Sequence, residues 1–192
     1  MGELLICRHG ETEWSRSGRH TGTTDVPLTP AGRANAAALR PLLADRPITH
    51  ALVSPRQRAR DTARLAGIVD PIVTDDLAEW DYGKYEGLTT AEIRRDRPGW
   101  TIWNGDPPGG ETASAVGRRA DRLLHRITPL LADGDVLVVG HGHFGRVLAA
   151  RYLRLPVSGG SLLRLDPATL CVLGTEHESP TILRWNLPGR RP

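Results

Sequence analysis

The sequence is poor in the residues and segments that mark secreted and membrane proteins. It has only two cysteines, Cys7 and Cys171. They form no Cys-x-x-Cys pair and are too few for a disulfide framework, so we expect two buried free thiols. No apolar run approaches the roughly 20 residues that span a bilayer. The short apolar run near the N-terminus follows no basic segment, unlike a signal peptide. These absences favour a cytoplasmic protein that has no membrane partner.

Lysine is also nearly absent, because Lys84 is the only lysine and every other basic residue is arginine. The planar guanidinium group of arginine suits carboxylates and phosphates. The formal net charge is +3, and the basic residues do not form a run with interleaved aromatic residues. A dedicated nucleic-acid surface is therefore disfavoured. The charge favours an anionic small molecule as the partner.

The order of apolar runs and turn residues predicts one α/β domain over residues 1–192, with a frayed tail at 190–192. Strands are expected at 4–7, 51–53 and 135–140, with strand-like runs over 161–187. Helices are expected at 29–43, 54–66, 111–131 and 144–153, and a short capped helix at 89. Pro129 should kink or end the helix over 111–131. Because strands and helices alternate, the sheet should be mainly parallel with helices on both faces, as a three-layer α/β/α sandwich.

Two histidines stand directly after predicted strands, in Arg8-His9-Gly10 and Gly140-His141-Gly142. Ligands of open α/β sheets bind beyond the carboxyl ends of the strands, so both histidines should face one pocket. Arg58 lies in the first turn of a helix that follows another strand and should border the same rim. His141 and His143 have the spacing of a ligand pair, but no cluster of Asp or Glu accompanies them, so no metal site is expected.

These motifs stand in the order found in one known family. They are Arg8-His9-Gly10-Glu11-Thr12, Ser54-Pro55 with Arg58, Glu79 with Tyr82-Gly83, and Gly140-His141-Gly142. From Leu4 to about Leu155 the chain resembles the histidine phosphatase superfamily, which contains cofactor-dependent phosphoglycerate mutases and many phosphatases. The resemblance implies a phosphoglycerate mutase-like fold.

Within that superfamily, the stretches 13–22, 78–87 and 140–144 are most similar to acid phosphatases and sugar-bisphosphate phosphatases. Trp14-Ser15 stands where the mutases usually have Trp-Asn, and the chain is shorter than typical mutases, which cover their site with extra segments. Both departures favour hydrolysis over return of the phosphoryl group to a sugar acid.

The resemblance implies hydrolysis of small phosphorylated metabolites, with sugar phosphates among the candidates, through a phosphohistidine on His9. Arg8, Arg58 and His141 would hold the phosphate, and Glu79 would be the general acid and then the general base. Further substrate contacts are carried over to a set of smaller or polar residues: Ser15, Thr21, Gly22, Tyr82 and Gly142. No cofactor and no metal are implied, and a homodimer is left open because related proteins often dimerise.

Two other functions remain open on the sequence. A cofactor-dependent phosphoglycerate mutase would use the same site and would depend on a bisphosphoglycerate primer. A non-catalytic module that binds anions or phosphopeptides is weakened, because a degenerate member should have lost at least one of the five catalytic residues: Arg8, His9, Arg58, Glu79 and His141.

Overall fold

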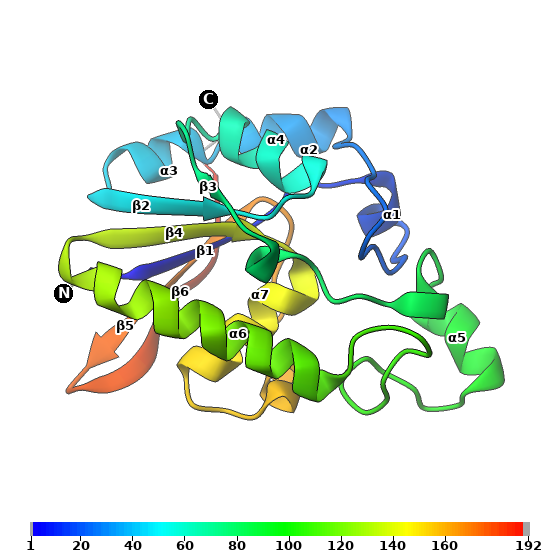
Figure 1. The fold of residues 1–192 in the computed structure, drawn as a ribbon. Coiled ribbons are helices and arrows are strands. Elements are labelled where there is room, and N and C mark those ends of the chain that lie inside the picture. The colour runs from blue at the N-terminus through cyan, green and yellow to red at the C-terminus, as the bar shows by residue number, and fades with distance from the viewer. Residues whose placement is uncertain (1, 190–192) are drawn as a thin grey trace.

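The computed structural model describes residues 2–189, so the tail expected at 190–192 lies outside the described residues (Figure 1). Its sheet has six strands in the order β3-β2-β4-β1-β5-β6. They are β1 (Leu4–Arg8), β2 (Ile48–Val53), β3 (Ile72–Val73), β4 (Asp135–Gly140), β5 (Thr169–Glu176) and β6 (Ser179–Pro188). Strands β3, β2, β4 and β1 are parallel, whereas β5 and β6 continue the sheet antiparallel. The predicted, mainly parallel sheet is confirmed.

Helices cover both faces of the sheet. They are α1 (Glu13–Arg16), α2 (Pro30–Ala37), α3 (Arg40–Ala44), α4 (Gln57–Leu65), α5 (Thr90–Asp96), α6 (Ala113–Ile127) and α7 (Gly142–Tyr152). Short 3₁₀ segments are η1 (Asp75–Leu77), η2 (Gly83–Tyr85), η3 (Thr128–Ala132) and η4 (Val157–Leu162). Figure 1 shows α2, α3 and α4 on one face and α6 and α7 on the other, which confirms the three-layer sandwich.

Alternating side chains of the central strands supply the two cores. On β1, Leu4 and Ile6 join the cluster formed with α6 and α7, whereas Leu5 and Cys7 join the cluster formed with α3 and α4. This alternation follows from the two-residue period of a strand, and near-complete burial on both faces is typical of parallel sheets. The central strands are therefore a rigid support for whatever follows their carboxyl ends.

Two prolines decide where predicted helices end. The helix expected at 29–43 is two helices, α2 and α3, because Pro41 stands in the first turn of α3. Proline lacks an N–H and its ring clashes with the preceding turn, so a single helix could not continue through it. The helix expected at 111–131 becomes 3₁₀ at η3, where Pro129 stands in the first turn. The cap expected at Thr89 is confirmed by its reciprocal hydrogen bonds with Glu92.

Both cysteines are buried free thiols, as predicted. Burial raises the pKa of the Cys7 thiol and of the Cys171 thiol to about 12 in each case, so neither is a ready nucleophile. Within residues 2–189, no helix has the length and apolar character needed to cross a membrane.

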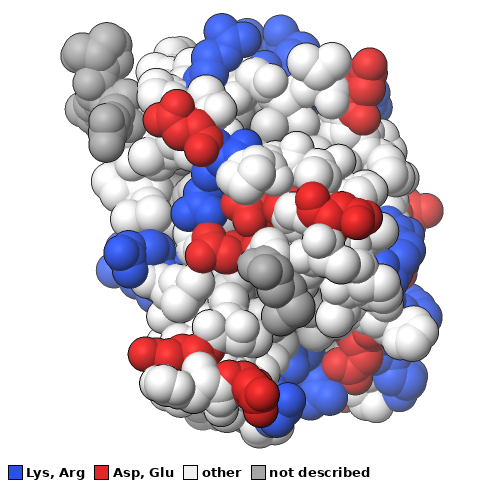
Figure 2. All heavy atoms as spheres, turned by 90° about the vertical axis from the view of Figure 1, so that its left-hand side faces the viewer, with Lys and Arg blue, Asp and Glu red and all other residues white. Residues whose placement is uncertain are grey.

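The register of the central strands brings the two His-Gly motifs side by side. Arg8 at the end of β1 pairs with Gly140 at the end of β4, so His9 and His141 leave the sheet as neighbours. The amino ends of these strands lie at the opposite edge, where Arg46 pairs with Glu3 and Asp135. Figure 2 faces that edge and shows acidic and basic groups side by side there.

Candidate active site

A cavity of about 180 Å³ opens at the carboxyl ends of β1 and β4. Seven of the residues predicted for the site line it: Arg8, His9, Ser15, Thr21, Glu79, Tyr82 and Gly142. Three predicted residues do not line the cavity: Arg58, His141 and Gly22. Of these, Arg58 and His141 are buried close behind it. The rest of the lining lies outside the ten predicted site residues: Gly18, Arg19, His20, Thr90, His143, Arg146 and Leu165.

The His9 ring is held so that one nitrogen is free. Its Nδ1 lies 2.7 Å from the carbonyl oxygen of Gly10. A carbonyl can only accept, so Nδ1 carries the proton and Nε2 keeps its lone pair. Burial lowers the pKa of His9 well below its usual value, and the charges of Arg8 and Arg58 lower it further. The ring is therefore a neutral imidazole whose Nε2 can attack an electrophile.

His141 is held by its other nitrogen. Its Nε2 lies 2.7 Å from Oγ of Ser54, and the two histidine ring centroids are 5.3 Å apart. The Ser54 hydroxyl also accepts from the N–H of Arg56. Its own proton has no acceptor among the described residues other than Nε2, so it donates there and leaves the His141 proton on Nδ1. That Nδ1 is buried and has no protein partner in the described chain.

Three of the four buried side-chain atoms that lack a partner in the described chain belong to predicted phosphate ligands, and the fourth, Nε of Arg56, does not. Within residues 2–189 the buried side-chain atoms that lack a partner are Nε of Arg8, Arg56 and Arg58, and Nδ1 of His141. An unsatisfied buried donor is costly, and each of these guanidinium atoms can only donate. A bound oxyanion would satisfy them, so the site is built for an acceptor-rich anion such as phosphate.

Arg8 and Arg58 are also fixed by backbone carbonyls. Arg8 Nη1 donates to Leu165 at 2.6 Å. Arg58 is fully buried and donates from both terminal nitrogens to Thr21, Gly22 and Thr24. Arg58 therefore holds the loop 21–24 in place, a second role that the motif did not indicate.

The smaller predicted contacts have distinct positions. Ser15 lines the cavity, but its hydroxyl is engaged with the backbone of Thr12 in the cap of α1. The N–H of Gly22 donates to the Glu86 carboxylate, so it is not available to a phosphate. A Cβ on Gly142 would lie 3.3 Å from the Arg8 guanidinium, a tight contact that glycine avoids.

Glu79 is anchored by three backbone N–H groups. Its Oε1 accepts from Trp80 and Phe144, and its Oε2 accepts from His143. Each carboxylate oxygen has two lone pairs, so Oε1 is saturated and Oε2 keeps one site for a proton. His143 and Phe144 belong to the first turn of α7, so Glu79 also caps that helix. The carboxylate is thus fixed in orientation at the edge of the cavity.

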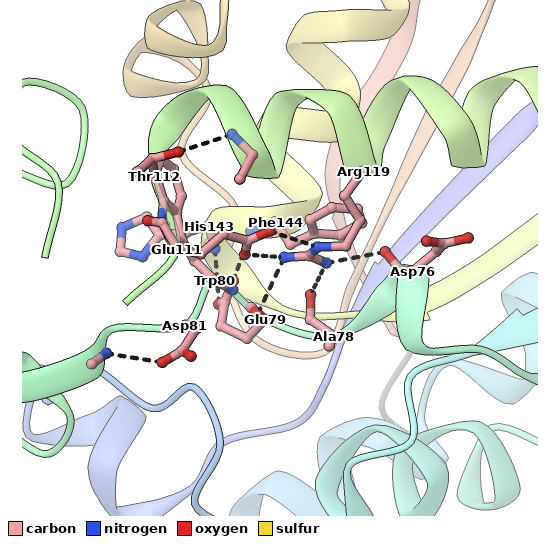
Figure 3. A network of polar contacts seen from close by, with 12 residues as sticks. Asp76, Ala78, Glu79, Trp80, Asp81, Glu111, Thr112, Arg119, His143 and Phe144 are labelled. Atoms are coloured by element: carbon pink, nitrogen blue, oxygen red, sulfur yellow. Dashed lines mark hydrogen bonds and ion pairs between the residues drawn. The ribbon is translucent and has the colours of Figure 1, made fainter. Parts of the chain in front are cut away.

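Arg119, on α6, holds the segment that carries Glu79 (Figure 3). Its guanidinium donates to the carbonyls of Asp76, Ala78 and Glu79 and makes a bidentate pair with Glu111. It also lies 4.3 Å from the centroid of the Phe144 ring. No pattern in the sequence indicates this role, since an arginine on a helix is usually a solvated side chain.

A second pair of histidines lines the outer part of the cavity. His20 and His143 are stacked, with ring centroids 5.9 Å apart and planes inclined by 16°. Tyr82, which was predicted to contact substrate, uses its hydroxyl to bond Nδ1 of His143 at 2.6 Å. Within residues 2–189, no group of three or more His, Cys, Asp or Glu side chains could hold a metal ion.

Known proteins are similar to this chain in sequence and in fold. The histidine phosphatase superfamily (branch 1) matches residues 4–188. An acid phosphatase of Mycobacterium tuberculosis is 45% identical over 176 residues, 91% of this chain and 87% of that protein. Sedoheptulose 1,7-bisphosphatase of Saccharomyces cerevisiae is 38% identical over 185 residues, 80% of this chain and 68% of that protein. A solved structure from M. tuberculosis is 42% identical with a TM-score of 0.95, and the match covers 98% of this chain and 99% of that one.

The sandwich and the paired histidines at the ends of β1 and β4 define a phosphatase-type enzyme. The chain belongs to the histidine phosphatase superfamily, as its sequence predicted, and has the phosphoglycerate mutase-like fold of that family. A phosphohistidine mechanism is general in the family.

Proposed function

We propose that the chain hydrolyses phosphate monoesters of small metabolites, with His9 as the nucleophile. The observation that carries this proposal is the set of unpartnered buried donors on Arg8, Arg58 and His141, next to a histidine with a free Nε2. Catalysis of phosphoryl transfer depends mainly on positioning and on charge stabilisation around the phosphate oxygens. These donors supply both.

The reaction has two steps. Nε2 of His9 attacks phosphorus, the P–O bond to the leaving alkoxide breaks, and Oε2 of Glu79 gives the alkoxide a proton. Glu79 then takes a proton from water, and the resulting hydroxide attacks the phosphohistidine. The P–N bond breaks, and inorganic phosphate and neutral His9 are released. The assignment to Oε2 follows from its remaining lone pair, because Oε1 is already saturated by two N–H donors.

Sugar phosphates are the proposed substrates. The relatives named acid phosphatase and sedoheptulose 1,7-bisphosphatase support phosphate esters of this kind. The cavity adds Arg19 and Arg146, besides the phosphate ligands, to its lining. We also propose that the reaction needs no metal ion, because the arginine and histidine donors would balance the charge of a bound phosphate. Two free thiols support a reducing, cytoplasmic location.

The experiment that tests this function is a phosphate-release screen over sugar phosphates, phosphoglycerates and nucleotides, run beside a mutase assay with a bisphosphoglycerate primer. We expect phosphate release without a primer. Glu79→Gln should slow hydrolysis of alkyl phosphates by about 10²–10⁴-fold and of aryl phosphates less, because a good leaving group needs little protonation. Primer-dependent mutase turnover without phosphate release would overturn the proposal in favour of the mutase. Full activity of Glu79→Gln on alkyl phosphates would remove Glu79 as the acid.

A further inference from the structure

His20 and His143 are anchored in opposite ways at the outer part of the cavity. His20 Nδ1 lies 2.8 Å from the carbonyl oxygen of Leu88, which can only accept. The His20 proton is therefore on Nδ1, and its Nε2 is an acceptor with a lone pair. No protein group among the described residues bonds that Nε2.

His143 is anchored by a hydroxyl instead of a carbonyl. Tyr82 is almost fully buried, and its hydroxyl has no acceptor in residues 2–189 other than Nδ1 of His143 at 2.6 Å. Burial, reinforced by the charge of Glu79, raises the pKa of Tyr82 well above its usual value, so the phenol keeps its proton and donates it to Nδ1. The His143 proton is then on Nε2, which makes Nε2 a donor.

Both rings are neutral. Burial lowers the pKa of His143 well below its usual value, with the charges of Arg146 and Arg8 acting in the same direction. Burial also lowers the pKa of His20. Because neither ring is charged, the pair does not add a second positive site for an anion. It adds one acceptor and one donor.

A hydroxyl group is the chemical partner of an adjacent acceptor and donor, since it donates once and accepts at the same oxygen. The two rings are neighbours in the cavity, with centroids 5.9 Å apart, so one bound molecule can reach the acceptor of His20 and the donor of His143 together. Both rings line the same cavity as His9 and Arg8, so such a hydroxyl would belong to the molecule whose phosphate faces His9.

We propose that His20 and His143 bind a hydroxyl group of the substrate beside its phosphate, and that Tyr82 is the positioning residue that makes His143 a donor. This proposal rests on the function proposed above. It identifies the substrate class as phosphate esters of polyols and sugars that carry a hydroxyl near the ester, and it assigns discrimination against simple alkyl phosphates to these two rings.

Glycerol 1-phosphate and n-propyl phosphate form a matched pair of three-carbon esters that tests the proposal. We expect the wild type to prefer the glycerol ester in kcat/KM by about 10-fold or more, because an unpaired polar group in the site disfavours the ester that lacks hydroxyls. Tyr82→Phe should reduce that preference by about 10-fold, mainly through KM for the glycerol ester. Equal kcat/KM for the two esters in the wild type would overturn the proposal.

Tyr85→Phe is the control for Tyr82→Phe. Tyr85 stands in the same segment and its hydroxyl accepts from Arg97, but it does not line the cavity, so its loss should leave the preference unchanged. A double-mutant cycle completes the test. In the His143→Phe background, Tyr82→Phe should cause no further loss of preference. A full additional loss there would show that Tyr82 does not act through His143.

A measurement without turnover separates this proposal from the function on which it rests. Long-range ¹H–¹⁵N spectra of labelled His9→Asn enzyme, which lacks the attacking nitrogen and does not consume the ester, should show His20 protonated at Nδ1 and His143 at Nε2, and glycerol 1-phosphate should shift the Nε2 signals more than n-propyl phosphate does. A His143 proton on Nδ1 would overturn the proposed hydroxyl site. Failure of the wild type to hydrolyse any phosphate ester, with these tautomers and shifts intact, would count against the catalytic function alone.

Discussion

The ends of β1 and β4 look alike in sequence and differ in chemistry. Each strand runs into a His-Gly pair, and the two rings are 5.3 Å apart. His9 bonds a carbonyl through Nδ1 and leaves Nε2 with a lone pair, whereas His141 bonds the Ser54 hydroxyl through Nε2 and leaves Nδ1 with a proton. One histidine is thereby a nucleophile and the other a donor to an anion. The role of each ring is set by what anchors it.

His20 and His143 show the same difference between a carbonyl anchor and a hydroxyl anchor. His20 is anchored by a carbonyl and His143 by a hydroxyl. A carbonyl only accepts hydrogen bonds, so the ring nitrogen that it contacts carries the proton. A hydroxyl with no other acceptor donates to the ring nitrogen that it contacts, so the ring proton lies on the other nitrogen. In this cavity, the partner of each ring is therefore a better guide to its chemistry than its neighbours in the sequence.

The largest expected effect comes from replacing His9 or His141 with asparagine. His9→Asn removes the attacking nitrogen, so kcat should fall by about 10⁴-fold or more and no phosphoenzyme should form. His141→Asn keeps an amide donor close to the position of Nδ1, so kcat should fall by about 10²–10³-fold while a phosphoenzyme still forms. Rapid-quench trapping and ³¹P NMR of the denatured protein measure both quantities. A phosphohistidine in His9→Asn that His141→Asn lacks would reverse the two roles.

The second prediction concerns stability against pH, which depends on the neutral state of the His9 and His141 rings. Burial lowers the pKa of His9 and of His141 in the folded protein, and nearby arginines lower both further. Below about pH 6.5 the unfolded chain takes up protons at these positions that the folded protein does not, so stability falls as the pH falls. Each histidine contributes up to about 1.4 kcal/mol per pH unit in this range.

Urea denaturation between pH 7 and pH 5 measures that loss. The free energy of unfolding should decrease as the pH falls. His141→Asn should reduce the slope of this free energy against pH by up to the contribution of one proton, about 1.4 kcal/mol per pH unit. Phosphate should oppose the loss, because a bound anion stabilises the protonated rings. A free energy of unfolding that is flat over this range would show that the buried histidines take up protons as readily in the folded enzyme as in the unfolded chain.

Much of this site could be predicted from the sequence because its main residues stand at the ends of recognisable elements. Arg8, His9 and His141 follow apolar strands, and parallel strands end at one edge of a sheet. The anchors could not be predicted, because they are distant in the sequence. Ser54 contacts a ring 87 positions away, and Arg119 reaches the carbonyl of Glu79 from 40 positions away. The N–H of Gly22 is similarly taken by Glu86, which no local pattern indicates.

The smallest expected effect tests the anchor of His141 directly. Ser54→Ala removes the hydroxyl that lies 2.7 Å from Nε2, so the ring can take its other tautomer and kcat should fall by about 10-fold, with weaker inhibition by phosphate. Ser54→Thr, which keeps a hydroxyl, should recover most of the loss. Ser17→Ala is the matched control, because that hydroxyl is exposed and bonds only carbonyls at the end of α1. If Ser54→Ala matched the wild type in both kcat and phosphate inhibition, the His141 tautomer would not depend on Ser54, and the contrast between the two strand ends would need another cause.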